Sequence, residues 1–407
     1  MAGCGWLMSG VAEAATNRIA IDQPPHNYWQ RPLNDRFSRL KGDLEAGRLP
    51  LDYSSEKAFV GSLLQTLGIP ASSQMLVFST TSLQLSLISP RNPRALYFNE
   101  ELYLGYVPGG KIEIVSLDPE LGGIYYIFNI PRDGTPPRPE RATRCMNCHA
   151  AEDSRYVPGL VIKSVVPGQR GGSLTSYRQE ETGHQIPIAD RFGGWYVTGK
   201  WGVTNHWGNV IGQLSPQGMA TYPVEAGRNF DWRRYPVANS DVLPQLLHEH
   251  QAGFVNRVVE AAYRTRALLY EAGGRVTEVQ AKEMDQFAEE LTRYLLFADE
   301  VPLGAPVAGE PAFRKDFLAT RKATKAGLSL KDFDLRTRLF QHRCSYMIYS
   351  SVFQSLPGEL KQRIYRQMGA ALRTDKPDPQ YAYLPAAEKQ AIHRILVETL
   401  KDLPAKW

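Results

Sequence analysis

Cysteine and histidine are scarce in this chain: among 407 residues there are four of the first and eight of the second. Only Cys145 and Cys148 form a C-x-x-C pair, and no pair of histidines has the H-x3-5-H spacing of zinc ligands. A structural zinc site needs further Cys or His pairs of this kind. The scarcity therefore argues against a zinc-binding domain. Cys344 stands alone and is expected to be a small buried apolar side chain.

Long apolar runs and clusters of basic residues are also missing. No run approaches the roughly 18 apolar residues that a membrane-spanning helix needs, so we expect no transmembrane helix. The formal net charge is +5, without Lys/Arg clusters or stripes of basic and aromatic side chains, which argues against a nucleic-acid partner. With 43% hydrophobic and 22% charged residues, the composition is that of a globular protein with a large core.

The most informative segment that is present is Cys145-Met146-Asn147-Cys148-His149, a C-x-x-C-H sequence. In proteins with covalent haem, the two thiols of this motif add across the porphyrin vinyl groups, and the adjoining imidazole becomes the proximal iron ligand. Half of a zinc site and a disulfide loop are the alternatives for the same residues. We predict one haem c, bonded through Cys145 and Cys148, with His149 on its iron.

A covalently attached haem also predicts the cell compartment in which the protein is found. Haem is joined to reduced C-x-x-C-H thiols outside the bacterial cytoplasm, so we expect a periplasmic or otherwise exported protein. Residues 1–20 are expected to be a leader or a lipoprotein remnant, because Ala12-Glu13-Ala14 resembles a peptidase site, although no basic residue precedes Arg18. Ala2-Gly3-Cys4 resembles the end of a lipoprotein box, which predicts a lipid anchor on Cys4 as the alternative.

The N-terminal half has the pattern of a β-rich region. Residues 54–67 predict one short helix that ends at Gly68. Apolar or alternating runs bounded by turn residues predict strands over 83–87, 96–98, 102–107, 111–117, 124–130 and 160–166. Pro108-Gly109-Gly110 predicts a hairpin between two of these strands. A loop rich in Pro and Arg over residues 131–144 then leads into the C-x-x-C-H motif.

The second half has the pattern of helices. Asp241 can cap a helix that carries an apolar stripe at helical period, and His250 lies in that stripe. Thr277 and Gln280 form a capping-box pattern at the start of another amphipathic helix. A connecting segment is predicted over 300–327, with further helices over 358–372 and 386–401.

These patterns predict an α+β fold. A β-rich haem-attachment region over residues 21–235 carries the motif, and a helical region over residues 236–407 packs on it and covers the haem. A small cytochrome c is a much shorter, helical domain in which the motif follows an N-terminal helix. Here the motif follows an extended loop in a far longer chain, so we do not expect the small all-α cytochrome c fold.

The functions of haem proteins depend on what occupies the second axial position of the iron. A second protein ligand suits electron transfer, whereas an open position binds small molecules. His206 is one candidate metal ligand, because glycines near it allow close approach to a flat group. His250 is the other, because its place on the apolar stripe buries it, whereas His248 is expected to face solvent. His184 is a weaker candidate. For each of them, a hydrogen bond to a neighbour without iron ligation is the alternative.

Several further segments are distinctive. They are Phe78-Ser79-Thr80-Thr81-Ser82, Gly193-Gly194-Trp195-Tyr196-Val197-Thr198-Gly199, His206 with Gly208-Asn209, Glu249-His250-Gln251, and Cys344-Ser345-Tyr346-Met347-Ile348-Tyr349-Ser350. Together they resemble a largely uncharacterised group of exported mono-haem c-type cytochrome proteins, over about residues 73–404. The resemblance implies an exported haem c protein of this architecture, with His206 and His250 near the haem. It implies no particular activity.

Three classes of function remain open from the sequence. The first is one-electron transfer as a carrier or redox subunit, with a redox partner protein that the mildly basic charge would attract. The second is an oxidoreductase that acts on peroxide, oxygen or another small molecule at an open iron. The third is a gas or redox sensor, or a structural haem subunit. We expect the first.

Overall fold

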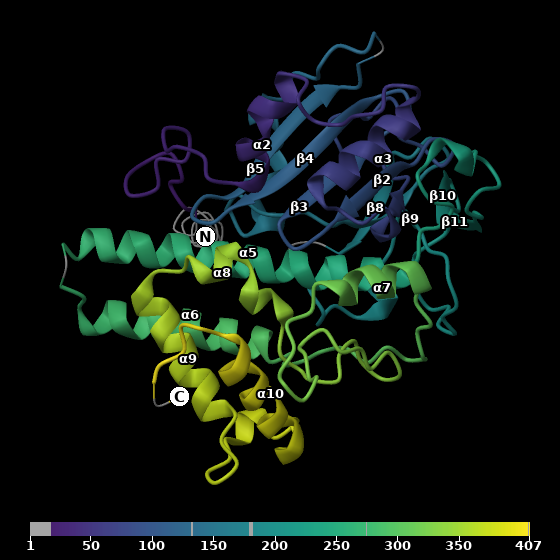
Figure 1. Cartoon of the computed structure of the whole chain (residues 1–407). Coiled ribbons are helices and arrows are strands. Elements are labelled where there is room, and N and C mark those ends of the chain that lie inside the picture. Colours follow the sequence, from purple (N-terminus) through teal and green to yellow (C-terminus); the bar gives the residue numbers. More distant parts are fainter. Residues whose placement is uncertain (1–17, 132, 179–181, 274, 406) are drawn as a thin grey trace, which may run out of the picture.

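The computed structural model describes residues 18–131, 133–178, 182–273, 275–405 and 407. The predicted peptidase site and the lipid anchor at Cys4 lie outside the described residues. No helix within these ranges is long and apolar enough to cross a membrane. Figure 1 shows a sheet with two helices on it, formed by the first half of the chain, and a group of helices formed by the second half. The predicted α+β fold is confirmed.

A seven-stranded antiparallel sheet forms the centre of the N-terminal half, in the order β6-β5-β4-β3-β2-β1-β9. Its strands are β1 (Met75–Val77), β2 (Arg94–Phe98), β3 (Leu102–Tyr106), β4 (Lys111–Asp118), β5 (Gly122–Asn129), β6 (Glu140–Arg141) and β9 (Trp195–Tyr196). The hairpin between β3 and β4 turns where it was predicted to. Gly109 stands in this turn at a φ of +80°, a conformation that glycine adopts without steric cost.

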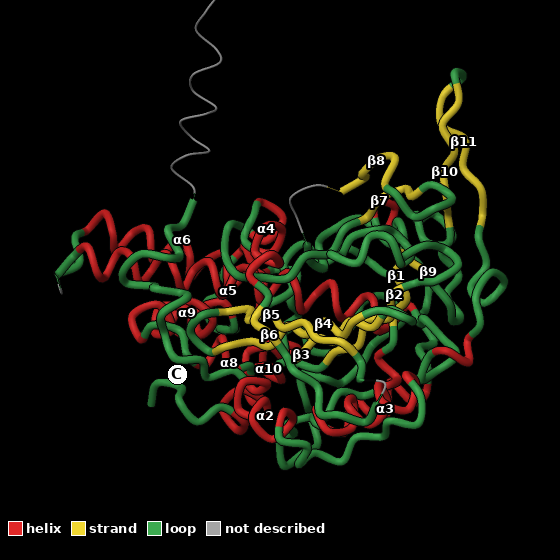
Figure 2. Tube along the Cα trace, turned by 90° about the horizontal axis from the view of Figure 1, so that it is seen from above, coloured by secondary structure: helices red, strands yellow, loops and turns green. Residues whose placement is uncertain are grey.

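The two faces of the sheet are covered by different parts of the chain. Helices α2 (Arg36–Glu45) and α3 (Glu56–Leu67) pack on one face and bury one apolar core there (Figure 1). Ser55 caps α3 and Gly68 ends it at a φ of +60°, as the sequence predicts. On the opposite side lie the short helix α4 (Met146–His149) and the long helix α5 (Val242–Glu271) (Figure 2). The C-x-x-C-H motif and the helical half therefore share one side of the sheet.

Helix α5 is buried at every position from Val242 to Val259, because it lies between the sheet and the remaining helices. Helix α6 (Glu278–Leu295) packs beside it and begins with the predicted capping box of Thr277 and Gln280. The other helices are α7 (Pro311–Ala319), α8 (Ser351–Gln354), α9 (Gly358–Ala371) and α10 (Ala386–Thr399). Short 3-10 helices are η1 (Ala71–Ser73), η2 (Thr143–Cys145), η3 (Glu152–Ser154), η4 (Ile188–Asp190), η5 (Trp232–Arg234), η6 (Tyr346–Tyr349) and η7 (Pro379–Tyr381).

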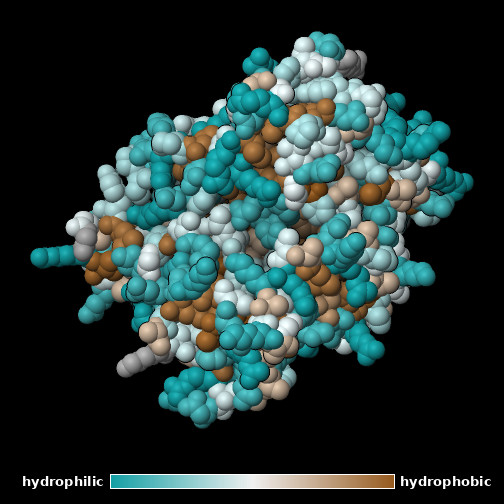
Figure 3. Space-filling model, in the orientation of Figure 1, coloured by the Kyte–Doolittle hydropathy of each residue, from teal (hydrophilic) through white to brown (hydrophobic). Residues whose placement is uncertain are grey.

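Two small antiparallel pairs stand beside the main sheet. Strands β7 (Ser164–Pro167) and β8 (Ser173–Arg178) form one, and β10 (Val210–Ser215) and β11 (Gly218–Pro223) form the other. The β10–β11 hairpin extends away from the body of the molecule in Figure 2. Polar residues predominate on the face drawn in Figure 3, and its apolar patches are interrupted by hydrophilic side chains.

Two predictions about secondary structure are wrong. Residues 83–87 form turns and no strand, with Leu83, Leu85 and Leu87 exposed by 45%, 58% and 38%. The segment is bent because its polar side chains bond to β4: Ser82 Oγ donates to Glu113 over 2.8 Å, and Gln84 Nε2 donates to the carbonyl oxygen of Lys111 over 3.1 Å. The predicted connection over 300–327 contains the helix α7, which begins with a proline, a residue suited to the first turn.

Candidate haem-attachment site

The C-x-x-C-H motif occupies a single turn of helix at the edge of the sheet region. Cys145 ends η2, and α4 then runs to His149. Both motif cysteines are free thiols; Cys145 is half-buried and Cys148 is exposed. Burial is the main reason that the pKa of the Cys145 thiol rises to about 11. The turn of helix thus presents two reduced thiols and one imidazole, which is the set of groups that covalent haem attachment uses.

His149 is held in one tautomer by the backbone. Its Nδ1 lies 2.9 Å from the carbonyl oxygen of Gly159, an acceptor, so Nδ1 carries the proton and donates it. The other ring nitrogen, Nε2, therefore keeps its lone pair. The ring packs on Tyr125 at a centroid distance of 4.8 Å, and burial lowers the pKa of His149, which favours the neutral form. A neutral imidazole with a free Nε2 is the form that binds iron.

The loop that supplies the Gly159 carbonyl is anchored to helix α5. Asn256 receives the backbone N–H of Leu160 on Oδ1 over 2.7 Å and donates from Nδ2 to the carbonyl oxygen of the same residue over 2.8 Å. The hydroxyl of Tyr125 donates to the Gly159 carbonyl as well, over 2.8 Å. A side chain at Gly159 would collide with Asn256, so the close approach requires glycine. The C-terminal half therefore positions the imidazole of the motif.

The sheet face beside α4 is incompletely covered by the chain. Leu96, Gly105, Glu113 and Ile127 are neighbours in register across β2, β3, β4 and β5. The three side chains of this row are only half-buried, although the row crosses the middle of the sheet. On the opposite face, the same strands are buried at Ala95, Tyr97, Leu104, Ile112, Ile114 and Phe128. A glycine inside a strand allows close approach of another group, and Gly105 lies in this uncovered row.

A hollow of roughly 800 Å³ continues this row to the residues just before the motif. Its lining includes Leu83, Leu87, Ile127, Ile130, Thr143 and Arg144. The leucines are those of the bent segment 83–87, which is exposed to an extent that is unusual for large apolar side chains in a row. Polar and charged side chains, among them Glu56, Lys111 and Glu140, complete the lining, and the hollow reaches the chain position that precedes Cys145.

An ion pair between Arg94 and Glu113 stands on the same sheet face, with 2.8 Å between Nη1 and Oε2. The charges of both residues act on the pKa of Cys145 and of His149, which places the pair close to the motif. Arg94 Nε is buried, and it has no hydrogen-bond acceptor among the described residues. An unpaired buried N–H group is costly, and an acidic group of a bound molecule would satisfy it.

His206 lies in a loop and is engaged by its own neighbours. Its ring stacks on Trp201 at a centroid distance of 5.6 Å and an interplanar angle of 5°, and it meets Phe192 edge-on. Nδ1 accepts the backbone N–H of Gly208 over 3.0 Å, so the proton of the neutral ring is on Nε2. In this tautomer neither nitrogen offers a free lone pair to a metal. Trp201 thus packs on the imidazole of His206.

His250 is buried, as predicted, but both of its ring nitrogens are occupied. Nδ1 lies 2.8 Å from Nδ1 of His184, and Nε2 lies 2.7 Å from Oγ of Ser345. Because Ser345 Oγ accepts the N–H of Met347, its hydroxyl proton can go to His250, which then donates from Nδ1 to His184. The ring also stacks on Phe297 at 4.5 Å. His184 and His250 thus form a buried pair, in which Nε2 of His184 has no hydrogen-bond partner among the described residues.

The expectation that His248 faces solvent is wrong. His248 is 7% exposed and packs on Phe98 and Tyr103 at centroid distances of 5.3 and 5.5 Å. Helix α5 is enclosed by protein on all sides at this point, so side chains outside its apolar stripe are buried as well. His248 was not among the candidate ligands predicted from the sequence, where its only distinguishing feature is its position two residues before His250. Cys344, in contrast, is fully buried as predicted.

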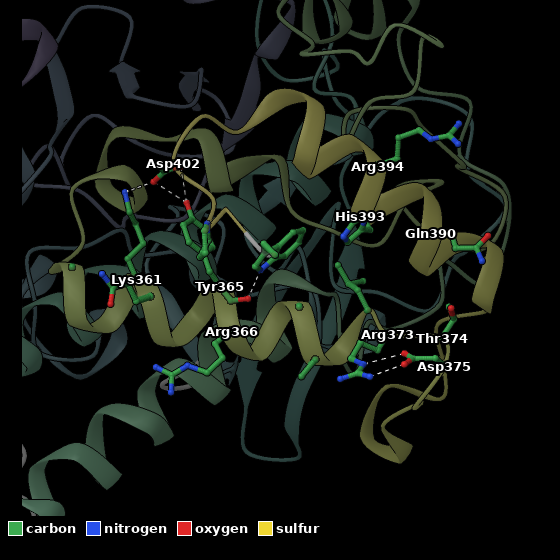
Figure 4. A pocket seen from close by; sticks show the side chains of 17 residues that line it. Lys361, Tyr365, Arg366, Arg373, Thr374, Asp375, Gln390, His393, Arg394 and Asp402 are labelled. Carbon is green, nitrogen blue, oxygen red and sulfur yellow. Dashed lines mark hydrogen bonds and ion pairs between the residues drawn. The ribbon is translucent and has the colours of Figure 1, made fainter.

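The described residues contain no group of three or more His, Cys, Asp or Glu side chains that could hold a metal ion. A haem brings four porphyrin nitrogens of its own and needs only one or two protein ligands. Another hollow lies between α9 and α10, where Lys361 bonds to Asp402 and Arg373 bonds to Asp375 (Figure 4). None of the predicted site residues lines it.

Comparison with known proteins finds no family model that matches the chain, no similar curated protein and no similar solved structure. The resemblance to exported mono-haem proteins therefore stays a prediction, and so do the roles that it implies for His206 and His250.

Proposed function

We propose that this protein is a mono-haem c-type cytochrome that transfers single electrons as a carrier or redox subunit. The observation that carries the proposal is the pairing of two free C-x-x-C thiols with an imidazole whose Nδ1 is tied to the Gly159 carbonyl. A disulfide loop would not need this tautomer, and a zinc site would need further Cys or His ligands, which the described residues do not bring together here. A proximal haem ligand needs this tautomer, because its second nitrogen must be fixed by a hydrogen bond while Nε2 binds iron.

The residues around the motif fit the cofactor. Cys145 and Cys148 would hold the porphyrin through thioether bonds, and His149 would hold its iron. The half-covered row of the sheet and the leucines of segment 83–87 supply apolar surface, and the unpaired Nε of Arg94 supplies a donor for an acidic substituent. When bound, the haem supplies reversible one-electron chemistry. The Gly159 carbonyl would strengthen the proximal ligand.

The same proposal includes an exported location and a redox partner protein. Haem c is attached outside the cytoplasm, and a protein that only passes electrons must dock with another redox centre. The formal charge of +5 favours a partner of acidic surface.

A second candidate function is supported by a specific observation. Neither His206 nor His250 has a free nitrogen lone pair in its present contacts, so neither is arranged to complete the coordination of an iron. If no other side chain does so, the iron keeps an open position. The protein would then be an oxidoreductase for peroxide, oxygen or another small molecule, or a gas or redox sensor.

Attachment is tested by producing the protein with the haem c maturation machinery in a bacterial periplasm. We expect a haem-stained band on a denaturing gel for the wild type and none for the double variant Cys145→Ala/Cys148→Ala. Cys344→Ala is the matched control, because it removes a buried thiol away from the motif and should keep the stain. A wild type without stain would contradict the proposal.

Function is tested on the stained protein. Electron transfer predicts a low-spin ferric spectrum, a reversible one-electron potentiometric titration and slow binding of cyanide or carbon monoxide. A high-spin ferric protein that binds these ligands rapidly would favour the small-molecule oxidoreductase or sensor.

A further inference from the structure

His248 is a buried imidazole without a hydrogen bond. Neither of its ring nitrogens is hydrogen-bonded to the described residues, a property that it shares with His342, and the side chain is 7% exposed. By contrast, His149, His206 and His250 each have at least one ring nitrogen bonded. Burial lowers the pKa of His248 to about 3, so the ring is neutral near pH 7. A neutral buried imidazole that lacks a partner leaves a nitrogen lone pair unused.

His248 and His149 stand over the same row of the sheet. His248 packs on Phe98 and Tyr103, and His149 packs on Tyr125. The strand register pairs Phe98 with Tyr103, Tyr103 with Val115 and Val115 with Tyr125, so these residues form one row across the sheet. Only β4 therefore separates the two supporting tyrosines, a spacing of roughly 10 Å between β3 and β5. Val115, between them, is only half-buried.

The electrostatics and the packing agree with this placement. Arg94, whose charge acts on Cys145 and His149, also acts on His248, so all three lie around one guanidinium. A cavity of only about 10 Å³, room for roughly one water molecule, borders His248 between Met75, Ile162, Phe192, Trp195, Gln245 and Glu249. Through its contacts with Phe98 and Tyr103, the imidazole lies on the side of the sheet that carries the motif.

We infer that His248, and neither His206 nor His250, is the second protein ligand of the iron, together with His149. The inference depends on the haem proposed above and deepens it: with His248 bound, the iron has two imidazole ligands, as electron transfer favours. Helix α5 would then serve the site twice, through Asn256 behind the proximal imidazole and through His248 in front of the iron.

The test uses the haem-loaded full chain and its ferric absorption and electron paramagnetic resonance spectra. We expect a low-spin wild type and a high-spin His248→Gln variant, which keeps most of the side-chain volume but not the ligand. Added imidazole should return His248→Ala to the low-spin state. His206→Ala and His250→Gln are the matched controls and should stay low-spin.

A further variant separates loss of the ligand from misfolding of the chain. His248→Met keeps an apolar body and a ligand, so it should remain low-spin with a higher reduction potential, as His/Met coordination gives. A low-spin spectrum that persists in both His248→Gln and His248→Ala, or a high-spin wild type, would overturn the inference while the haem proposal stands. A chain without covalent haem would overturn the haem proposal itself.

Discussion

The imidazole of His149 and the carbonyl of Gly159 are joined by a hydrogen bond of 2.9 Å, and the loop that carries Gly159 is held by the C-terminal half of the protein. The Gly159 carbonyl lies in a loop that is anchored to helix α5, because Asn256 of that helix forms two hydrogen bonds with the backbone of the next residue, Leu160. The N-terminal half therefore carries the motif, and the C-terminal half fixes the tautomer of its histidine. If the motif binds a haem, as we propose, this division gives the C-terminal half a role in holding the proximal ligand.

The first prediction concerns the anchor of that loop. Asn256→Ala removes both bonds to Leu160 and leaves a buried N–H and carbonyl unpaired, so we expect a loss of about 2 kcal/mol in the free energy of unfolding. The reduction potential should also change, because the proximal imidazole loses its fixed partner. Urea unfolding and potentiometry measure the two effects. Asn205→Ala, at an exposed position, should change neither.

The second prediction separates attachment from ligation. In His149→Gly both thiols remain, so haem should stay on the denatured polypeptide. The Soret and visible bands should change because the proximal nitrogen is lost, and imidazole in solution should restore them. Unchanged bands in His149→Gly would show that another residue binds the iron.

The third prediction concerns the buried pair of His184 and His250. His250→Ala removes a buried ring stacked on Phe297 and leaves Ser345 and His184 without their shared partner, so we expect a loss of about 3 kcal/mol of stability. The spin state of the iron should not change. A destabilised variant that also becomes high-spin would assign ligation to His250.

The fourth prediction concerns acid sensitivity. Burial lowers the pKa of His250 to about 3, whereas the same imidazole in the unfolded chain titrates near 6.5. Between these values the unfolded state binds a proton that the folded state does not, so stability falls as pH falls. From pH 7 to pH 4.5 this histidine should account for about 2.5 kcal/mol of the loss. His250→Gln should show a smaller decrease than the wild type in urea titrations at these two pH values.

The sequence predicted those parts of the fold in which local signals decide. The β3–β4 hairpin, helix α3 and the capping box of α6 each follow from turn or capping residues that act on their immediate neighbours. Segment 83–87 shows the limit of such signals. Its leucines alternate as in a strand, but side-chain bonds from Ser82 and Gln84 to β4 hold it in turns.

The site was predictable only where it is contiguous in sequence. Cys145, Cys148 and His149 are adjacent, so their pattern identifies them. Nothing in the sequence shows that Gly159 accepts from His149, or that His184 and Ser345 occupy both nitrogens of His250. The burial of His248 depends on what packs on each side of α5, and periodicity along one helix cannot show that.

The last prediction concerns the leucines of segment 83–87. Leu83 and Leu87 line the hollow that leads to the motif, yet they are exposed by 45% and 38%. If a porphyrin covers them, Leu83→Ser/Leu87→Ser should admit water to it, which lowers the reduction potential because a wetter site favours the more charged ferric state. Stability without haem should change little, since the side chains are already exposed. Leu214→Ser is the control, because this leucine is 62% exposed on the β10–β11 hairpin. Equal potentials for the double variant and the control would place the porphyrin elsewhere on the sheet face.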